Sequence, residues 1–157
     1  MSGLFDDLDL ESASDNPFEI PDDKYGLTIT KVDFKKDHVG KNNADAAPRD
    51  YVILEYTINE GEHPTAIGQS TQEWFWRPKK GDDSQDAARA KSFLKKRLLS
   101  LGIPENRMNQ IGPDDLIGID VYGTMKLKGG FSNLVPGTVE VRSGHAAAGS
   151  KAFAGFK

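Results

Sequence analysis

One segment of the chain, residues 83–101, has the apolar spacing of an amphipathic helix, and this spacing sets the framework for the rest of the sequence. Its apolar side chains recur with a period of 3.6 residues and form one stripe: Ala87, Ala90, Phe93, Leu94, Leu98 and Leu101. Asp83 or Ser84 is a suitable N-cap, while Gly102 and Pro104 end the pattern. The sequence therefore predicts one helix in the middle of the chain.

The remaining surface of this helix is basic. Its cations are Arg89, Lys91, Lys95, Lys96 and Arg97. They cluster toward the C-terminal half, where the helix dipole favours positive charge. Because this explanation is structural, we interpret the basic face as solvated surface of the helix.

Outside the helix, apolar and polar residues alternate as they do in strands. The alternation predicts three strands before the helix and two after it: residues 25–33, 51–59, 69–77, 117–127 and 134–142. Gly123 suits a bulge within the fourth strand, and Pro136-Gly137 interrupts the fifth. This order predicts a mainly β (α+β) fold, a five-stranded OB-like barrel with one helix between strands 3 and 4.

The two ends of the chain differ in composition from its middle. Residues 1–23 carry eight acids and no base, although the whole chain has a formal net charge of only -4. Residues 143–157 are rich in Gly, Ala and Ser. We therefore expect a disordered acidic arm over 1–23, a net basic OB-like domain over 24–142 and a flexible tail over 143–157.

The acidic arm also contains apolar residues. Leu4, Phe5 and Leu8 stand beside Asp6 and Asp7, and the three apolar side chains could form one face of a helical turn on binding. The arm is then either a solvated tail, a docking motif for a protein partner, or an acidic mimic that competes for the basic surface of the domain.

Several classes of function lack their residues. There is no cysteine, and His38, His63 and His145 lie in expected loops without the spacing of a triad or metal site. Neither a Walker lysine pattern nor a GxGxxG motif follows a strand. We expect no enzyme activity, no metal and no cofactor.

The chain also lacks an apolar run of about 18 residues and begins with acids, so we expect a cytoplasmic protein.

The run from Trp74 to Lys80 joins aromatic surface to positive charge. It holds both tryptophans of the chain and continues into Arg77, Lys79 and Lys80. Single-stranded nucleic acids need this combination, because bases stack on aromatic faces and cations neutralise phosphates. In a strand, Trp74 and Trp76 face one side and Phe75 the other. Either the tryptophans stack bases and Phe75 is core, or the reverse.

The first hypothesis is therefore sequence-tolerant binding of single-stranded DNA. The candidate stacking residues are Trp74, Trp76 and Tyr122. The candidate phosphate contacts are Arg77, Lys79, Lys80, Lys126 and Lys128, with Lys35 and Lys36 from the first loop. The alternative is a protein-interaction or virion-assembly domain whose terminal arms are functional. Enclosure of both tryptophans by Leu54, Leu94 and Ile119 would remove the stacking platform.

Several segments together carry a family resemblance: residues 21–25 leading into Leu27-Thr28-Ile29, residues 51–58 with the Glu60-Gly61 turn, the helix 91–103, residues 116–123, and Ser132-Asn133. Through them residues 17–142 resemble a group of bacteriophage-encoded single-stranded DNA-binding proteins with an OB-like fold. The resemblance implies a role in phage DNA replication or recombination, in the host cell cytoplasm, with replication or recombination proteins as partners. Better-known members carry their acidic segment at the C-terminus, whereas here it is at the front.

Overall fold

The strands of the molecule form one antiparallel sheet, and the fold is mainly β. The computed structural model describes residues 3–12, 16, 18–39 and 48–142. In the sheet the strands follow the order β3-β2-β1-β4-β5, and β6 pairs with β4. Their bounds are β1 Asp23–His38, β2 Arg49–Glu60, β3 Ser70–Trp76, β4 Asp120–Lys128, β5 Phe131–Leu134 and β6 Glu140–Val141. The α-helices are α1 Gln85–Ser100 and α2 Pro113–Leu116.

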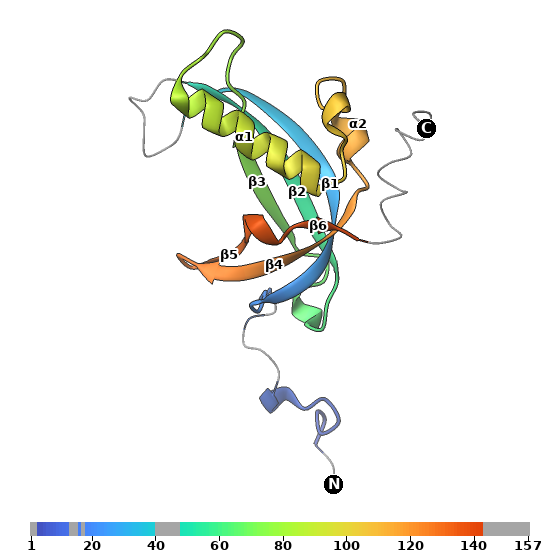
Figure 1. Cartoon of the computed structure of the whole chain (residues 1–157). Coiled ribbons are helices and arrows are strands. Elements are labelled where there is room, and N and C mark those ends of the chain that lie inside the picture. The colour runs from blue at the N-terminus through green and yellow to red at the C-terminus, as the bar shows by residue number, and fades with distance from the viewer. Residues whose placement is uncertain (1–2, 13–15, 17, 40–47, 143–157) are drawn as a thin grey trace.

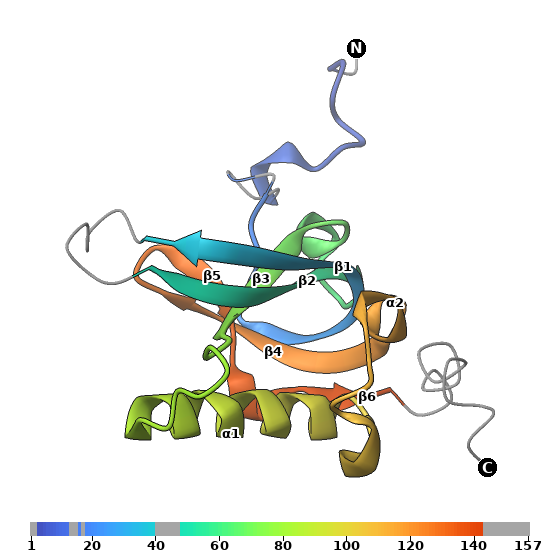
Figure 2. The ribbon, with the colours of Figure 1, turned by 90° about the horizontal axis from the view of Figure 1, so that it is seen from above.

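Single 3-10 turns complete the elements at Leu10–Ser12, Pro64–Ala66, Glu105–Arg107 and Pro136–Thr138. Figure 1 shows the sheet curving so that β5 approaches β3, with α1 lying beside β3. The view in Figure 2 shows α1 as a separate layer along one side of the curved sheet. The predicted helix between the third and fourth strands is thus confirmed.

Strand β1 is much longer than the predicted 25–33, and irregularities in its pairing bend it. It pairs with β2 from Gly26 to His38 but with β4 only over Asp23–Thr28. Its register with β2 shifts at three places, between Gly26 and Leu27, Ile29 and Lys31, and Lys35 and His38. Such shifts increase local bend and twist. They allow one strand to serve two neighbours that diverge in space.

The predicted fifth strand, 134–142 with an interruption at Pro136-Gly137, is two short strands in the structure, and the first of them begins earlier than predicted. Gly129 and Gly130 both have positive φ, which allows a two-residue hairpin turn, so β5 begins directly at Phe131. The turn Pro136–Thr138 then separates β5 from the short β6.

The expected bulge at Gly123 is also absent, since Gly123 pairs in register with Tyr25. A Cβ on Gly123 would instead meet Leu134 at 2.7 Å, so the glycine makes room for that side chain.

The core lies inside the curve of the sheet. It is formed by inward side chains of β1, β2 and β4 and is closed by residues from the segment after α1: Tyr25, Leu27, Ile29, Leu54, Tyr56, Ile58, Leu101, Ile103, Ile119, Val121 and Met125. Strand alternation over 117–127 would put Ile117 and Leu127 on the same face as Ile119, but they are 41% and 64% exposed. Ile117 precedes the start of β4, and Leu127 lies beyond the part of β4 that pairs with β1.

The folded part begins before residue 24. The hydroxyl of Thr65 donates to the carbonyl of Glu19 at 2.7 Å, and Ser132 donates to Ile20 at 3.1 Å. Ile20 also packs against the core. Residues 18–22 therefore belong with the sheet, while the expected tail 143–157 and part of the arm lie outside the described residues. No helix in the described part of the chain is long and apolar enough to cross a membrane.

Both ends of α1 have the expected caps. Ser84 Oγ accepts from the backbone N–H of Ala87 at 3.2 Å. At the other end Gly102 has φ +84°, and the N–H of Ile103 reaches back to the carbonyl of Leu98 at 3.0 Å. This is the Schellman arrangement, in which glycine adopts the left-handed conformation without strain.

Arg97, predicted on the surface of α1, is buried and holds the helix to the sheet. Its Nε and Nη2 donate to the two carboxylate oxygens of Glu73 in β3, at 2.9 and 2.6 Å. Nη2 also donates to the carbonyl of Pro136 at 3.0 Å, and the hydroxyl of Tyr56 donates to Glu73 at 2.6 Å. Burial, followed by the charge of Glu73, raises the pKa of Tyr56. We call these four residues the Arg97 clamp.

We expect Arg97→Leu to lower the free energy of unfolding by about 3–5 kcal/mol, because it leaves the Glu73 carboxylate buried without its partner. The triple variant Tyr56→Phe/Glu73→Leu/Arg97→Leu removes the polar groups together and should recover at least half of that loss. Urea denaturation followed by tryptophan fluorescence measures both. A single variant that loses less than about 1 kcal/mol would show that the clamp is dispensable.

Candidate nucleic-acid interface

Three rings from three neighbouring strands meet on one face of the sheet. The ring centroid of Trp74 in β3 lies 5.4 Å from that of Tyr51 in β2 and 5.1 Å from that of His38 in β1. His38 and Tyr51 are 5.7 Å apart in an edge-to-face arrangement. We call His38, Tyr51 and Trp74 the ring cluster. Strand register produces it, since Tyr51 pairs with Trp76 on one side and Lys35 on the other.

Cations lie against these rings. The Nζ of Lys35 is 5.4 Å from the centroid of Trp74, and the guanidinium of Arg49 is 4.0 Å from that of Trp76. Both distances are within the range of cation–π attraction. Lys36 is exposed in the same stretch of β1. Aromatic surface and positive charge therefore occur together at the end of the β1–β2–β3 ribbon, as stacking and phosphate neutralisation require.

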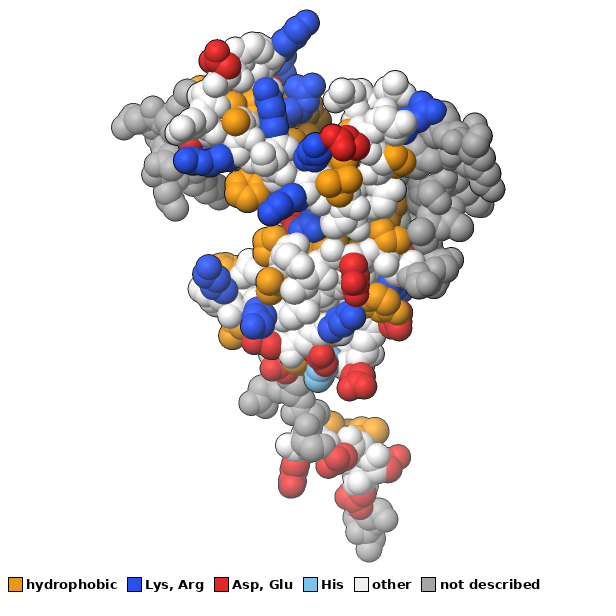
Figure 3. Space-filling view, in the orientation of Figure 1, with side chains coloured by type: hydrophobic (Ala, Val, Ile, Leu, Met, Phe, Trp, Pro, Cys, Tyr) orange, Lys and Arg blue, Asp and Glu red, His pale blue; other side chains and the backbone are white. Residues whose placement is uncertain are grey.

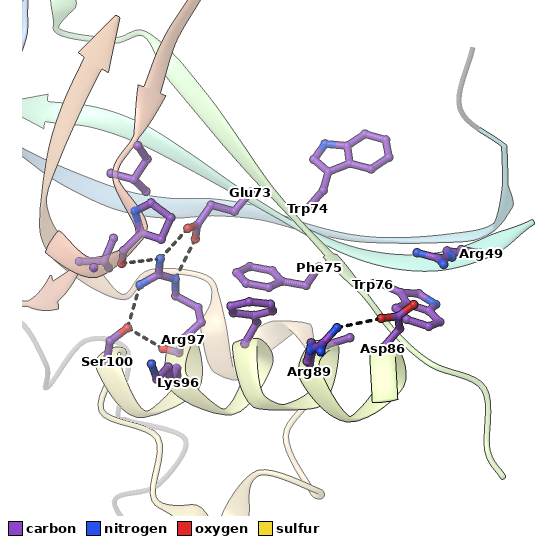
Figure 4. A pocket seen from close by; sticks show the side chains of 16 residues that line it. Arg49, Glu73, Trp74, Phe75, Trp76, Asp86, Arg89, Lys96, Arg97 and Ser100 are labelled. Atoms are coloured by element: carbon purple, nitrogen blue, oxygen red, sulfur yellow. Dashed lines mark hydrogen bonds and ion pairs between the residues drawn. The ribbon is translucent and has the colours of Figure 1, made fainter. Parts of the chain in front are cut away.

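The tryptophans are not enclosed by Leu54, Leu94 and Ile119. Trp74 is 42% exposed, Trp76 is half-buried, and Phe75 packs against the core. In Figure 4 Trp74 lies on the side of β3 away from α1, whereas Phe75 points toward the helix. Of the two arrangements open to the Trp-Phe-Trp run, the structure has the one with Phe75 inside.

A groove of about 870 Å³ runs beside this face, between β3, α1 and the turn Pro136–Thr138. We call it the β3-side groove. Trp74 and Trp76 line it from β3, and Phe93, Arg89 and Lys96 line it from α1. Figure 4 shows Arg49, Trp76 and Asp86 meeting at one end of the groove and the Arg97 clamp at the other. It is thus continuous with the ring cluster through the two tryptophans.

The charged side chains are unevenly distributed along the molecule. In Figure 3 blue Lys and Arg side chains predominate over the part that carries α1, red Asp and Glu side chains predominate on the N-terminal arm, and both colours occur at the end of the body next to the arm. The formal net charge of -4 averages over these two regions. At an ionic strength near 0.1 M charges are screened beyond about 10 Å, so a ligand near α1 experiences mainly the basic region.

The structure brings together only part of the predicted set of binding residues. Trp74, Trp76 and Lys35 lie at the ring cluster, with Lys36 close in sequence. Arg77 lies on the other face, where its guanidinium is 5.5 Å from the ring of Phe34. It lines a second groove of about 750 Å³ between α1 and α2, which we call the α2-side groove. Lys79 pairs with Asp37 at 3.2 Å, and Lys80 is exposed in the following turn.

Tyr122, Lys126 and Lys128 are remote from the tryptophans. Tyr122 pairs with Gly26 near the start of β1, whereas the ring cluster lies near the end of β1, roughly 30–40 Å further along the bent strand at the usual rise per residue. Lys24 and Arg142 lie against its ring, at 4.9 and 5.7 Å. Lys126 and Lys128 lie at the β4–β5 hairpin. These three residues do not share a surface with Trp74.

Sequence reasoning missed His38, Tyr51, Arg49 and Phe93. His38 was assigned to a loop because the alternation of β1 ends near residue 33, yet β1 continues to His38. Tyr51 was recognised as a strand residue, but its pairing opposite Trp76 could not be read without the register. Phe93 was counted in the apolar stripe of α1, although its side chain is 63% exposed.

The arm residues Leu4, Phe5 and Leu8 are exposed, with Leu4 at 90%. They belong to a local turn, in which a carboxylate oxygen of Asp6 accepts from the N–H of Gly3 at 2.8 Å and Leu8 N–H donates to the carbonyl of Phe5 at 3.1 Å. Figures 1 and 2 show residues 3–12 apart from the sheet. The predicted partner residues, with Asp7, therefore form no part of the ring cluster.

No group of three or more metal-ligating side chains is present among the described residues. The one histidine–carboxylate contact recorded there joins His63 Nε2 to Asp23 at 2.9 Å. The backbone N–H of Lys24, followed by the His63 ring, lowers the pKa of Asp23.

Comparisons of the chain with family models, curated proteins and solved structures find no match. The geometry of the ring cluster and its surroundings therefore carries the functional argument.

The different environments of the two tryptophans can be measured. We expect Trp76→Phe, which retains Trp74, to be quenched more strongly by acrylamide than Trp74→Phe, which retains the half-buried Trp76 under Arg49. Stern–Volmer plots of the two single-tryptophan variants give the comparison. Equal or reversed quenching constants would contradict the arrangement of β3.

Proposed function

We propose that the chain is a sequence-tolerant single-stranded DNA-binding protein built on an OB-like barrel. The strand order supports the barrel, because β1 is flanked by β2 and β4 while the outer strands β3 and β5 approach each other. The helix α1 between β3 and β4 is in the position that the OB-fold requires. OB-folds bind oligonucleotides on the face of strands 2 and 3 and at the adjoining loops.

The single observation that carries the proposal is the exposed ring of Trp74 within the ring cluster, beside Lys35. It lies on β3, next to β2 and near the β1–β2 connection, which is where an OB-fold holds its ligand. Every base has a π-face, so stacking on Trp74 and Tyr51 tolerates any sequence. Lys35, Lys36 and Arg49 neutralise phosphates and release counterions, which makes the affinity dependent on salt.

The family resemblance supports a role for this activity in phage DNA replication or recombination, in the cytoplasm of the host cell. A strand-binding protein there protects single strands and presents them to replication or recombination enzymes. Stacking with little reading of base edges suits that task, because the strands exposed during replication have every sequence.

We expect Trp74→Ala to weaken binding of oligo-dT of about 30 nucleotides by roughly 5- to 150-fold, the value of one stacked base. Phe18→Ala, which removes an exposed ring outside the cluster, is the control and should change little. Fluorescence anisotropy over a salt series measures both. Tyr122→Ala should have a small effect because of its distance. Absence of binding by the intact chain at low salt would refute the proposal.

The acidic arm supports a second role, as a competitor for the DNA-binding surface or as a docking motif for replication or recombination proteins. Leu4, Phe5 and Leu8 are exposed beside Asp6 and Asp7, which favours docking of a partner. Deleting residues 1–12 removes four acids and no base, so the formal net charge rises from -4 to zero.

We expect this deletion to tighten DNA binding and to increase the difference between low and moderate salt, since the repulsion that it removes is strongest where salt screens it least. The shorter chain keeps residues 18–22, which hydrogen-bond to the sheet. Unchanged affinity would leave docking as the role of the arm. If neither chain binds DNA, the alternative of a protein-interaction or virion-assembly domain with functional arms takes its place.

A further inference from the structure

Phe93 is an unusual residue on the surface of α1. Its side chain is 63% exposed, yet it faces the β3-side groove, across from β3 and the turn Pro136–Thr138. Arg89 and Lys96 lie one turn to either side of it along the helix and line the same groove. The helix dipole favours cations near the C-terminus of α1 but does not explain a large exposed ring between two of them.

The groove has an apolar floor and a basic rim. Phe75, Leu134 and Val139 form part of the floor, and Arg49, Arg89 and Lys96 lie at the rim. Its two acids already have cationic partners, Glu73 with Arg97 at 2.6 Å and Asp86 with Arg89 at 3.3 Å. A ligand that combines a flat apolar ring with negative charge fits this lining better than a neutral apolar ligand would.

The groove also continues the surface on which we place the DNA. Trp76, under the guanidinium of Arg49, stands at its entrance, and Trp74 lines it from the ring cluster. β3 is the last strand of the hydrogen-bonded order on this side, so its outer edge faces the groove. A strand that stacks on Trp74 can therefore cross the edge of β3 and reach α1.

We propose that α1 is the second wall of the DNA-binding site. A nucleotide of the bound strand enters the β3-side groove, its base stacks on Phe93, and its neighbouring phosphates lie at Arg49, Arg89 and Lys96. This inference rests on the proposed function and deepens it, because it assigns a binding role to a helix whose charges have a structural explanation. The volume of about 870 Å³ is within the range of pockets that enclose small molecules.

The first test removes the ring. We expect Phe93→Ala to weaken binding of oligo-dT of about 30 nucleotides by roughly 5- to 150-fold, as the loss of one stacked base does. Leu99→Ala is the matched control, because Leu99 is an exposed apolar residue of the same helix that lines neither groove. It should bind as the unmodified chain does. Equal effects of the two substitutions would overturn the inference.

The second test uses the cations on the two sides of α1. Arg89→Ala/Lys96→Ala removes two cations from the β3-side groove, and Lys91→Ala/Lys95→Ala removes two from the α2-side groove. Both double variants change the net charge equally. We expect the first pair to reduce the slope of log K against log salt by about 1.4, since each phosphate contact on a single strand contributes about 0.7. The control pair should reduce it by less than half as much.

The outcomes separate the two proposals. If the intact chain binds DNA and Trp74→Ala weakens it, but both charge pairs have the same slope and Phe93→Ala binds normally, then α1 is no part of the site and the proposed function stands. That result would leave the groove to another occupant, such as an acidic peptide. If the intact chain does not bind, the proposed function fails and this inference fails with it. Urea midpoints within a narrow range confirm that each variant is folded.

Discussion

The buried pair of Arg97 and Glu73 is the contact on which the arrangement of the other elements depends. It joins α1 to β3, and through the carbonyl of Pro136 it joins both to the turn that follows β5. The turn is distant in sequence from β3 and α1, and the three elements form the walls of the β3-side groove. Taking two charges out of water is unfavourable, and the pair persists because four hydrogen bonds satisfy both carboxylate oxygens and the groups that donate to them. The clamp thereby fixes how far α1 stands from β3, and so the width of the groove.

The ring cluster depends on a different constraint, the length and bend of the β1–β2 ribbon. His38 reaches Trp74 because β1 extends beyond the core and shifts register near Lys35. Beyond the core, one face of the ribbon no longer needs to be apolar. Aromatic and basic residues can occupy it without loss of core packing, which is why the exposed rings and the cations Lys35 and Arg49 are found there.

Much of the fold could be predicted from the sequence, because alternation and helical period are local signals. They located the helix with both of its caps, and they located β1 to β4 approximately. The burial of Arg97 could not be predicted, because its partner Glu73 is 24 residues away in the sequence. The helix pattern alone places any cation on the surface. The break at Pro136 was read correctly, but the two-residue turn at Gly129 and Gly130 moved the start of β5 to Phe131.

The sequence likewise predicts only part of the candidate site. Trp74, Trp76 and Lys35 could be proposed from residue type, because stacking and phosphate neutralisation need those side chains. Which face carried the site depended on the choice between Phe75 and the tryptophans, and burial decides that choice. Tyr122 has the aromatic side chain that stacking requires, but it lies away from the other candidate residues. The type of a side chain can be read from the sequence, whereas the position of Tyr122 depends on the register between β1 and β4.

The segregation of charge explains how an acidic chain can offer a site for a polyanion. Asp and Glu predominate on the arm, Lys and Arg predominate over α1, and Lys35 and Arg49 lie against the tryptophans. Over distances longer than the screening length the two regions act almost independently. For the proposed DNA ligand, the acidic arm opposes approach from its own end and leaves the basic region as the favourable surface. Net charge is a poor guide to the ligand of such a molecule, and the position of each charge relative to the aromatic surface is the informative quantity.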